Sequence, residues 1–392
     1  MGQVVIVVRV IVGVLALVGV AAVLGSMLRT VVVPRGVPAR LARAAFLAFY
    51  FLLQLRLRLT GRSDYATRDR IFAVGAPLGP FAQLATWGVL IWLLFAALFW
   101  SLTASTIDGP GISHALELSG SSMLTLGFDS PHGLLRQLAA FAAAAVGLTL
   151  LALVIAYLPT LYGTFSRREQ LITKLTVRAG APASGPALLS STWELGRFEQ
   201  LEEVWEPWED WFIELGESHT SYPQLVFFRS PRANNHWVLA SEAVLDGAAL
   251  LLTACDVPRA TRTQLCLHAG IHALLSIADF LAISHRPPEP GAETLLSEEK
   301  FNEAFNHLQS IGVPMRDDRH AAWVAFRALR ARYEHLLTVL GRLTDAPRSD
   351  WSSWTEDTPR HTPPLIRPRQ QRRDTTASEA RRRSGKSGGP TG

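Results

Sequence analysis

Residues 119–133, SGSSMLTLGFDSPHG, are the part of the chain whose composition and position could do chemistry. They lie between two hydrophobic runs that are each long enough to cross a membrane. The segment carries one charge, Asp129, and has glycine at positions 120 and 127, where a plain loop needs neither. Non-helical backbone is tolerated at membrane depth only where protein buries it or where it lines water. The segment is therefore a candidate for the lining of an aqueous path.

Three elements must position this segment. Residues 83–102 form an apolar span with Trp87, Trp92 and Trp100 placed as interfacial aromatic residues would be, and residues 134–162 form a second, alanine-rich span. Between them, the pattern over residues 113–124 predicts a helix capped by Ser113. Twelve helical residues extend only about 18 Å, so this helix would enter a membrane partway.

An outer helix, a short helix, Thr-x-Gly-aromatic and an inner helix together resemble the pore module of tetrameric potassium channels. In that family the stacked carbonyls of a Thr-Val-Gly-Tyr-Gly filter replace the hydration shell of the ion. The resemblance places Thr125, Leu126, Gly127 and Phe128 on the first four filter positions. It also implies a gating hinge at Gly147 and a kink near the inner mouth at Pro159, and it covers residues 83–169.

The chain departs from the family pattern at Asp129. Either Asp129 replaces the second filter glycine, or that glycine is deleted and Asp129 matches the acidic residue that usually follows it. Glycine suits this position because the carbonyl alignment needs unusual dihedral angles, which cost Asp about 1–2 kcal/mol. A ring of four Asp129 carboxylates would concentrate cations at the outer mouth, so cation conduction is a safer expectation than strict potassium selectivity.

Two plainer interpretations stay open. The spans could form a helical hairpin without a pore, since Thr-Leu-Gly-Phe alone is a short motif. Gly147 could serve close helix packing rather than a hinge, because small residues let membrane helices approach each other.

The remaining membrane half predicts the topology. Residues 4–28 form an apolar helix, for which an uncleaved span is favoured over a signal peptide. The arginine-rich stretch from Arg29 to Arg70 is then expected in the cytoplasm, with the N-terminus outside and the C-terminus inside. Within it, residues 44–55 are apolar but short, which favours a helix lying in the inner interface over a further crossing.

The second half is predicted to be an all-α cytoplasmic domain. Its expected helices cover residues 193–204, 207–215, 237–255, 260–284, 297–311 and 317–343. His268 and His272 lie four residues apart, a spacing that can bind zinc, but no third or fourth ligand is evident and structural packing is favoured. The aromatic residues among the acidic ones (Trp193, Phe198, Trp205, Trp208 and Trp211) are expected in the core or on a partner-facing surface. Cys255 and Cys266 are expected as buried, reduced thiols.

Charge is concentrated in the tail. The 392 residues carry a net charge of +5, but the chain from Arg360 onward holds nine Lys/Arg against two Asp/Glu, which leaves −2 on the rest. The basic pI of 9.5 therefore describes a tail that is solvated or touches anionic lipid, and it gives no support for nucleic-acid binding. No catalytic motif is present, so neither enzymatic activity nor a cofactor is expected.

The sequence thus predicts an all-α membrane protein, a cation channel subunit of the plasma membrane that works as a homotetramer. The partners expected are potassium or other monovalent cations and membrane lipid. The alternative is a membrane-anchored sensor or scaffold that does not conduct. The predicted parts are an N-terminal helix with a basic segment (1–78), a pore module (79–169), a linker (170–187), a helical domain (188–345) and a disordered basic tail (346–392).

Overall fold

The computed structural model describes residues 2–31, 48, 51–52, 55, 65–103, 111–196, 201–232, 235–257, 260–283, 295–347 and 351. Within these residues the regular structure is helical, apart from one isolated β-bridge between Cys255 and Met315. The prediction of an all-α protein is confirmed at this level. Most of residues 44–55, Phe198 and nearly all of the basic tail lie outside the described residues, so the expectations for them stay predictions.

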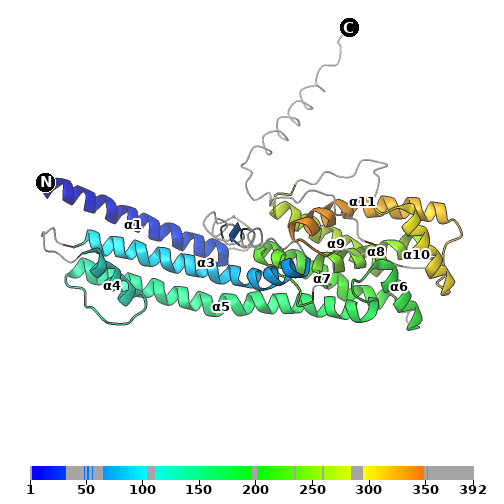
Figure 1. The fold of residues 1–392 in the computed structure, drawn as a ribbon, viewed down its shortest axis with the longest axis horizontal. Helices are drawn as coiled ribbons and strands as arrows, with labels where there is room; N and C mark the ends of the chain where they lie inside the picture. Colours follow the sequence, from blue (N-terminus) through cyan, green and yellow to red (C-terminus); the bar gives the residue numbers. More distant parts are fainter. Residues whose placement is uncertain are drawn as a thin grey trace, which may run out of the picture.

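Three long helices run side by side along the molecule: α1 (Gly2–Val31), α3 (Tyr65–Ser101) and α5 (Leu134–Ala179). The short helix α4 (Ile112–Met123) packs against α3 and α5 near the N-terminal end of α1, and the later helices form a domain at the opposite end (Figure 1). By length and composition α1, α3, α5 and α8 (Trp237–Ala254) could each cross a membrane. The structure is thus compatible with a membrane protein.

The helices α1, α3, α4 and α5 share one apolar core, which we call the apolar bundle. Its most buried side chains include Met27, Trp87, Ile91 and Phe99. Arg9, in the apolar first half of α1, donates to the carbonyl of Thr103 and lies over the ring of Trp100, 5.1 Å from its centroid. A charge on an apolar helix is tolerated when it is paired in this way.

Helix α5 is longer than the predicted inner span. It continues without interruption past Pro159 to Ala179, about 70 Å in all, so the helix that flanks the pore segment also enters the second domain. The expected linker over residues 170–187 is correspondingly reduced to residues 180–184, because Leu175 and Ala179 are buried in the core of the second domain and keep the chain helical.

The second domain, called here the C-terminal domain, is a bundle of six α-helices and one 3₁₀ turn within the described residues. These are α6 (Gly185–Glu194), α7 (Leu201–Ser221), η2 (Pro223–Phe227), α8 (Trp237–Ala254), α9 (Thr261–Phe280), α10 (Glu298–Ser310) and α11 (Arg319–Leu343). Helix α8 lies at the centre of this domain, and 94% of its eighteen residues are buried inside the protein. The expectation that residues 237–255 form a buried helix of a bundle rather than a span therefore agrees with the structure.

Helix ends follow the predicted capping in part. Ser297 caps α10 by accepting from the N–H of Lys300 at 3.3 Å, as expected. The predicted helix over residues 193–204 is wrong, because α6 ends at Glu194 and Gly196 adopts a φ of +66°. The helix predicted over residues 207–215 begins earlier, at Leu201, and ends later, at Ser221, so Pro207 lies inside α7.

A buried charge network holds α8 to α11. Arg330 is fully buried and donates to Asp246 (3.0 Å), Glu242 (2.9 Å) and Glu334 (2.8 Å). The hydroxyl of Tyr333 also donates to Asp246, at 2.6 Å, and burial raises the pKa of Glu334. Removing this arginine is costly, because it would leave three carboxylates without their shared cation.

Replacing Arg330 with Ala should therefore destabilise the C-terminal domain by about 3–5 kcal/mol, because it leaves buried carboxylates without a cation. The thermal unfolding transition of the purified full-length protein measures the loss. The loss should be smaller at pH 5 than at pH 8, since a carboxyl group without its cation takes up a proton more readily. Arg332→Ala, which removes an exposed cation from the same helix, is the control and should change stability by less than about 0.5 kcal/mol.

Candidate functional site

The short helix α4 starts without a side-chain cap. Gly111 occupies the N-cap position with an extended backbone, and no side chain accepts from the first turn, so the expected cap by Ser113 is wrong. The helix spans twelve residues, one position earlier than predicted, and ends at Met123. Its length of about 18 Å is well short of the roughly 30 Å of a bilayer's hydrocarbon core.

Two reciprocal hydrogen bonds fix α4 to the outer helix α3. The hydroxyl of Ser119 donates to the carbonyl of Trp92 at 2.7 Å, and the indole N–H of Trp92 donates to the carbonyl of Leu116 at 3.0 Å. Ser119 is completely buried. The indole also passes close to Gly120, where an added Cβ would lie 3.3 Å from its nitrogen. The registration of α4 on α3 is thus set by specific polar contacts.

The C-terminal end of α4 lies directly on α5 at Gly147. A Cβ placed on Gly147 would be 1.9 Å from the carbonyl oxygen of Met123, far inside any allowed contact. The glycine is therefore required for the close approach of the two helices, which is the packing role that the sequence left open beside a hinge. Helix α5 is continuous through both Gly147 and Pro159.

The backbone that follows α4 turns back on the end of that helix. The N–H of Leu126 donates to the carbonyl of Ser121 at 2.8 Å, and the N–H of Phe128 donates to the hydroxyl of Ser121 at 2.9 Å. Thr125 and Gly127 adopt left-handed conformations, with φ of +55° and +73°. Such alternation of handedness gathers successive backbone groups on one side of the chain.

The carbonyl groups of residues 125–128 differ in their hydrogen bonding from the two N–H groups that donate to Ser121. Within the described part of the chain, no donor reaches the carbonyl oxygen of Thr125, Leu126, Gly127 or Phe128. The segment is exposed, with Phe128 82% and Leu126 50% accessible. It thus turns two N–H groups inward to α4 and leaves its carbonyl oxygens without donors.

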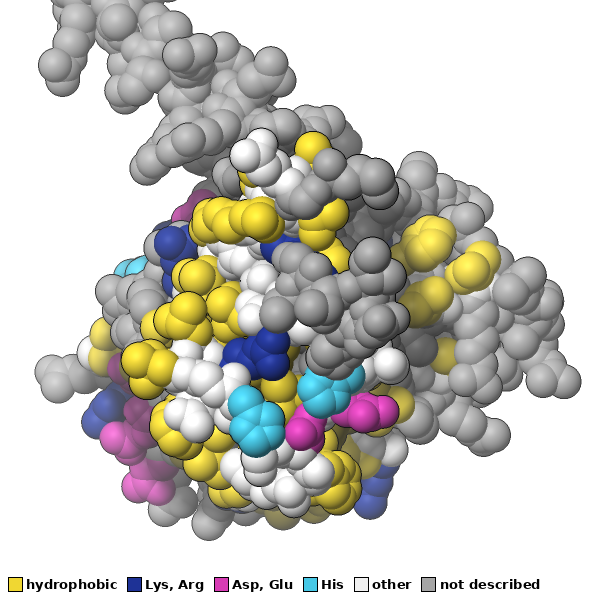
Figure 2. All heavy atoms as spheres, turned by 90° about the vertical axis from the view of Figure 1, so that its left-hand side faces the viewer, with side chains coloured by type: hydrophobic (Ala, Val, Ile, Leu, Met, Phe, Trp, Pro, Cys, Tyr) yellow, Lys and Arg dark blue, Asp and Glu magenta, His cyan; other side chains and the backbone are white. Residues whose placement is uncertain are grey.

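Asp129 ends the segment beside a histidine. One carboxylate oxygen of Asp129 lies 3.3 Å from Nδ1 of His114 in the first turn of α4, and both side chains are about one-third exposed. Glu117 and His132 are also exposed at this end. Figure 2 shows histidine and acidic side chains gathered on this end face of the molecule. Histidine and acidic side chains therefore lie at the same end of the molecule as the predicted filter residues.

The other end of the apolar bundle is joined to the C-terminal domain through Arg168. This buried side chain of α5 donates to the carboxylate of Glu169 at 2.8 Å and to the carbonyls of Leu225 and Phe228 at 2.9 and 2.8 Å. It also lies 3.1 Å from Nε2 of His219. Burial, and then the charge of Arg168, lower the pKa of His219, so His219 is neutral and accepts from the guanidinium.

Both long helices on either side of residues 119–133, α3 and α5, contact the stretch from Tyr222 to Ser230. Nε2 of Gln224 donates to the side-chain oxygen of Gln83 on α3 at 3.0 Å, and the hydroxyl of Tyr157 on α5 lies 3.4 Å from the Gln224 oxygen. Arg229 donates to Asp69 on α3 at 3.1 Å. We call residues 222–230 the junction segment, since it joins α3 and α5 to the domain.

Sequence reasoning found the filter candidates but missed the residues that hold them. The sequence did not single out Arg168, Ser121, His114 or the junction segment as functional candidates. A serine one turn before the end of a half-helix is a usable signal for Ser121. Apart from the adjacent Glu169, the partners of Arg168 lie more than 50 residues away, and nothing in the local sequence indicates them.

The candidate zinc pair is not supported by the described residues. His268 and His272 are both exposed on α9, whereas the nearby Cys266 is fully buried. Within the described chain no group of three His, Cys, Asp or Glu residues could hold a metal ion. Both cysteines are free and buried as expected, and burial raises the pKa of Cys255 to about 12. Trp205, Trp208 and Trp211 are buried as well, which agrees with the core interpretation.

No family model, curated protein or solved structure matches this chain.

The contact at Gly147 gives a prediction that separates packing from hinge bending. Gly147→Ala should lower the melting temperature of the purified protein, because its Cβ would overlap the Met123 carbonyl. Gly25→Ala is the matched control, since nothing lies within 4 Å of that position on α1, and it should leave the melting temperature unchanged or raised. Equal behaviour of the two variants would contradict a packing role for Gly147.

Proposed function

We propose that the chain is a subunit of a membrane cation channel whose pore forms on an axis shared by four copies. The observation that carries the proposal is the polarity of residues 125–128. Leu126 and Phe128 direct their N–H groups to Ser121, and the carbonyl oxygens of the segment have no donor in the described chain. The segment lies between two helices long and apolar enough to cross a membrane.

The carbonyl oxygens of residues 125–128 would favour a cation in the proposed tetramer. If four copies enclose the segment and bury these oxygens, a carbonyl without a partner is costly, and a dehydrated monovalent cation supplies the missing positive charge. The resemblance to the Thr-Val-Gly-Tyr-Gly filter makes potassium the first candidate ion, with selectivity weakened at Asp129.

Assembly follows from the incompleteness of one chain. A single copy of residues 125–129 cannot enclose an axis, and Phe128 and Leu126 are exposed in the isolated chain. Helix α5 also exposes a row of large apolar side chains on the same part of the molecule, namely Leu134, Leu135, Leu138, Phe141, Leu148, Leu151 and Ile155. Neighbouring copies or lipid must cover this surface. Four copies are the number that the resemblance implies.

The proposed location is the plasma membrane, with the pore segment and the N-terminus outside and the C-terminal domain in the cytoplasm. The arginines between Arg29 and Arg70 support this orientation through the positive-inside rule. The antiparallel course of α1 and α3 agrees with it, since Arg9 near the start of α1 contacts Thr103 at the end of α3.

The assembly is tested by native mass measurement of the protein in detergent or nanodiscs, with a homotetramer as the expected result. Folding is monitored on the same sample by circular dichroism. A folded monomer or dimer would contradict the pore and leave the alternative, a membrane-anchored sensor or scaffold.

Conduction is tested by ion flux in proteoliposomes. We expect cations to pass, anions to be excluded, and potassium to be only modestly preferred over sodium. Gly127→Ala should abolish the flux, because alanine disfavours a φ of +73° by about 1–2 kcal/mol in each of four copies. Gly111→Ala is the control, since Gly111 has a φ of −70° and an added Cβ there meets nothing closer than 3.9 Å. A Gly127→Ala protein that conducts like the wild type would refute the filter.

Asp129 gives a separate prediction on conductance. Asp129→Asn should lower the flux most at low ionic strength, where the carboxylate's attraction for cations is least screened. Measurements at about 10 mM and 500 mM salt make the comparison, and exclusion of anions should persist in the variant. An equal reduction at both salt concentrations would indicate that Asp129 acts through the backbone rather than through its charge.

A further inference from the structure

A cavity of about 150 Å³ lies in the C-terminal domain, between the last turns of α5 and the start of α7. Its wall is formed by Leu171, Lys174, Leu175 and Arg178 from α5, Leu188 from α6, and Glu203, Val204, Pro207 and Trp208 from α7. Neither the pore segment nor the junction segment contributes to it. The cavity is therefore separate from the residues on which the function proposed above rests.

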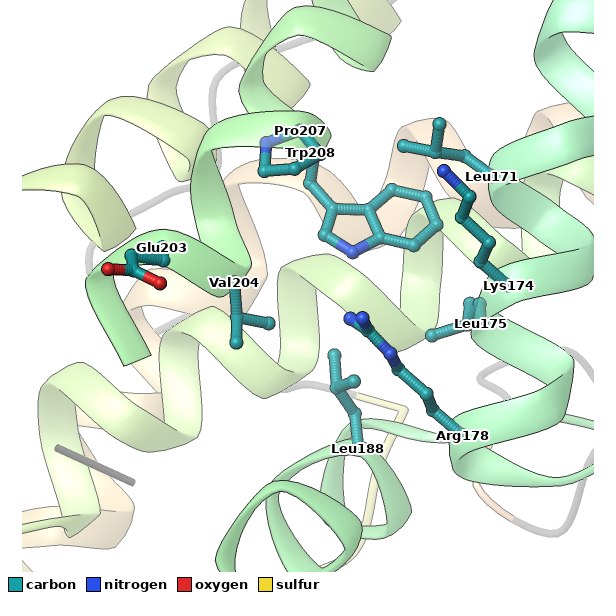
Figure 3. Close-up of a pocket in the computed structure, with 9 residues that line it drawn as sticks. All are labelled: Leu171, Lys174, Leu175, Arg178, Leu188, Glu203, Val204, Pro207 and Trp208. Carbon is teal, nitrogen blue, oxygen red and sulfur yellow. The ribbon is translucent and has the colours of Figure 1, made fainter. Parts of the chain in front are cut away.

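Two cations of α5 face this cavity. Lys174 and Arg178 are one helical turn apart, and Figure 3 shows both charged ends directed to the side where the Trp208 ring lies. Within the described chain neither forms an ion pair, in contrast to Arg167 on the same helix, which binds Glu214 at 2.6 Å. The carboxylate of Glu203 points away from them (Figure 3). Two like charges held together in this way favour an anion between them.

Trp208 adds a third donor. Its side chain is 4% exposed, and its indole nitrogen lies on the ring edge that faces Arg178 (Figure 3). Trp193 and Trp211 each donate to a backbone carbonyl, at 2.7 and 3.2 Å. No hydrogen bond of the Trp208 indole exists within the described residues. Within the described residues the indole N–H groups of Trp87 and Trp205 are closed off from solvent, whereas that of Trp208 is accessible and can donate to a group bound in the cavity that its side chain lines.

The remaining side chains of the cavity wall determine which kind of anion can bind. Leu171, Leu175, Leu188 and Val204 are apolar, so a strongly hydrated ion such as phosphate would fill the cavity poorly. A protein cavity of about this volume lined by apolar side chains accommodates one benzene ring. The cations are exposed and lie at the mouth, while the indole and the leucines form the interior.

We propose that this cavity binds a small organic anion, an aromatic monocarboxylate with a single ring. Its carboxylate accepts from Lys174, Arg178 and the Trp208 N–H, and its ring lies against the leucines and the indole. Because α5 continues from this cavity to the pore segment, occupancy would also alter conduction, a consequence that rests on the proposed channel function.

The test is isothermal titration calorimetry of the purified full-length protein with benzoate and with phenylacetate as probes. We expect saturable binding of at least one of them, with one site per chain, and no binding of the neutral amide benzamide. Inorganic phosphate should bind at least tenfold more weakly than the better carboxylate. No saturable binding of either carboxylate, or phosphate binding as tightly, would overturn the proposal.

Variants locate the site. Arg178→Gln and Lys174→Gln should each weaken carboxylate binding about tenfold, and Trp208→Phe, which keeps the ring and removes the N–H, about fivefold. Arg332→Gln removes an exposed cation elsewhere in the domain and should have no effect. If Arg332→Gln weakens binding as much as Arg178→Gln, the anion responds to overall charge and the cavity is not its site. Circular dichroism checks that each variant is folded. If Arg178→Gln unfolds, carboxylate binding is compared between the two conservative variants Lys174→Arg and Trp208→Phe instead.

Calorimetry measures anion binding without measuring conduction, so it tests the anion site independently of the proposed channel. Carboxylate binding that is lost in Arg178→Gln supports the site even in a protein that conducts no ions. Flux without carboxylate binding supports the channel and overturns the site.

Discussion

The arrangement of the molecule depends on the hydrogen bonds that the buried guanidinium of Arg168 donates. A charge taken out of water is costly unless every donor is satisfied, and here Glu169, His219 and two backbone carbonyls supply the acceptors. Those acceptors belong to α5, α7 and the junction segment, so the guanidinium has its partners in only one relative position of the three. Since α5 is one unbroken helix, this position also fixes the distance between the C-terminal domain and the pore segment.

The junction segment extends the same constraint to the outer helix. Gln224 bonds Gln83 on α3 and contacts Tyr157 on α5, while Arg229 reaches Asp69 on α3 and the carbonyl of Asp345 after α11. A displacement of these residues would therefore move both helices that hold α4. Because α4 is bound to α3 by Ser119 and to α5 at Gly147, such a displacement reaches the segment that follows it. This is a continuous physical path between the domain and residues 125–129.

Sequence alone predicted the long apolar helices, α4 to within one residue, and the central helices of the C-terminal domain, because hydropathy and length are local properties. It placed α6 and α7 wrongly. The aromatic and acidic pattern continues across residues 193–211, whereas α6 ends at Glu194 and Gly196 is left-handed, and the Trp193 indole there donates to the carbonyl of Ile311, 118 residues away. The candidate filter was visible as a motif. Its support by Ser121, and the role of Arg168, depend on the folded chain and were not visible.

The orientation of the N–H and carbonyl groups of residues 125–128 affects how Asp129, where the sequence departs from the potassium-channel pattern, would influence ion selectivity. If cation preference came from the Asp129 carboxylate, it would depend on the contact of that carboxylate with the His114 imidazole, 3.3 Å away. The carbonyl oxygens carry no such dependence, since their partial charge is fixed and the N–H groups of Leu126 and Phe128 are already committed to Ser121. An anion entering the segment would therefore meet oxygen atoms and few free N–H groups. Exclusion of anions is thus a property of the backbone in the proposed pore, and Asp129 with His114 adjusts only how many cations gather at its entrance.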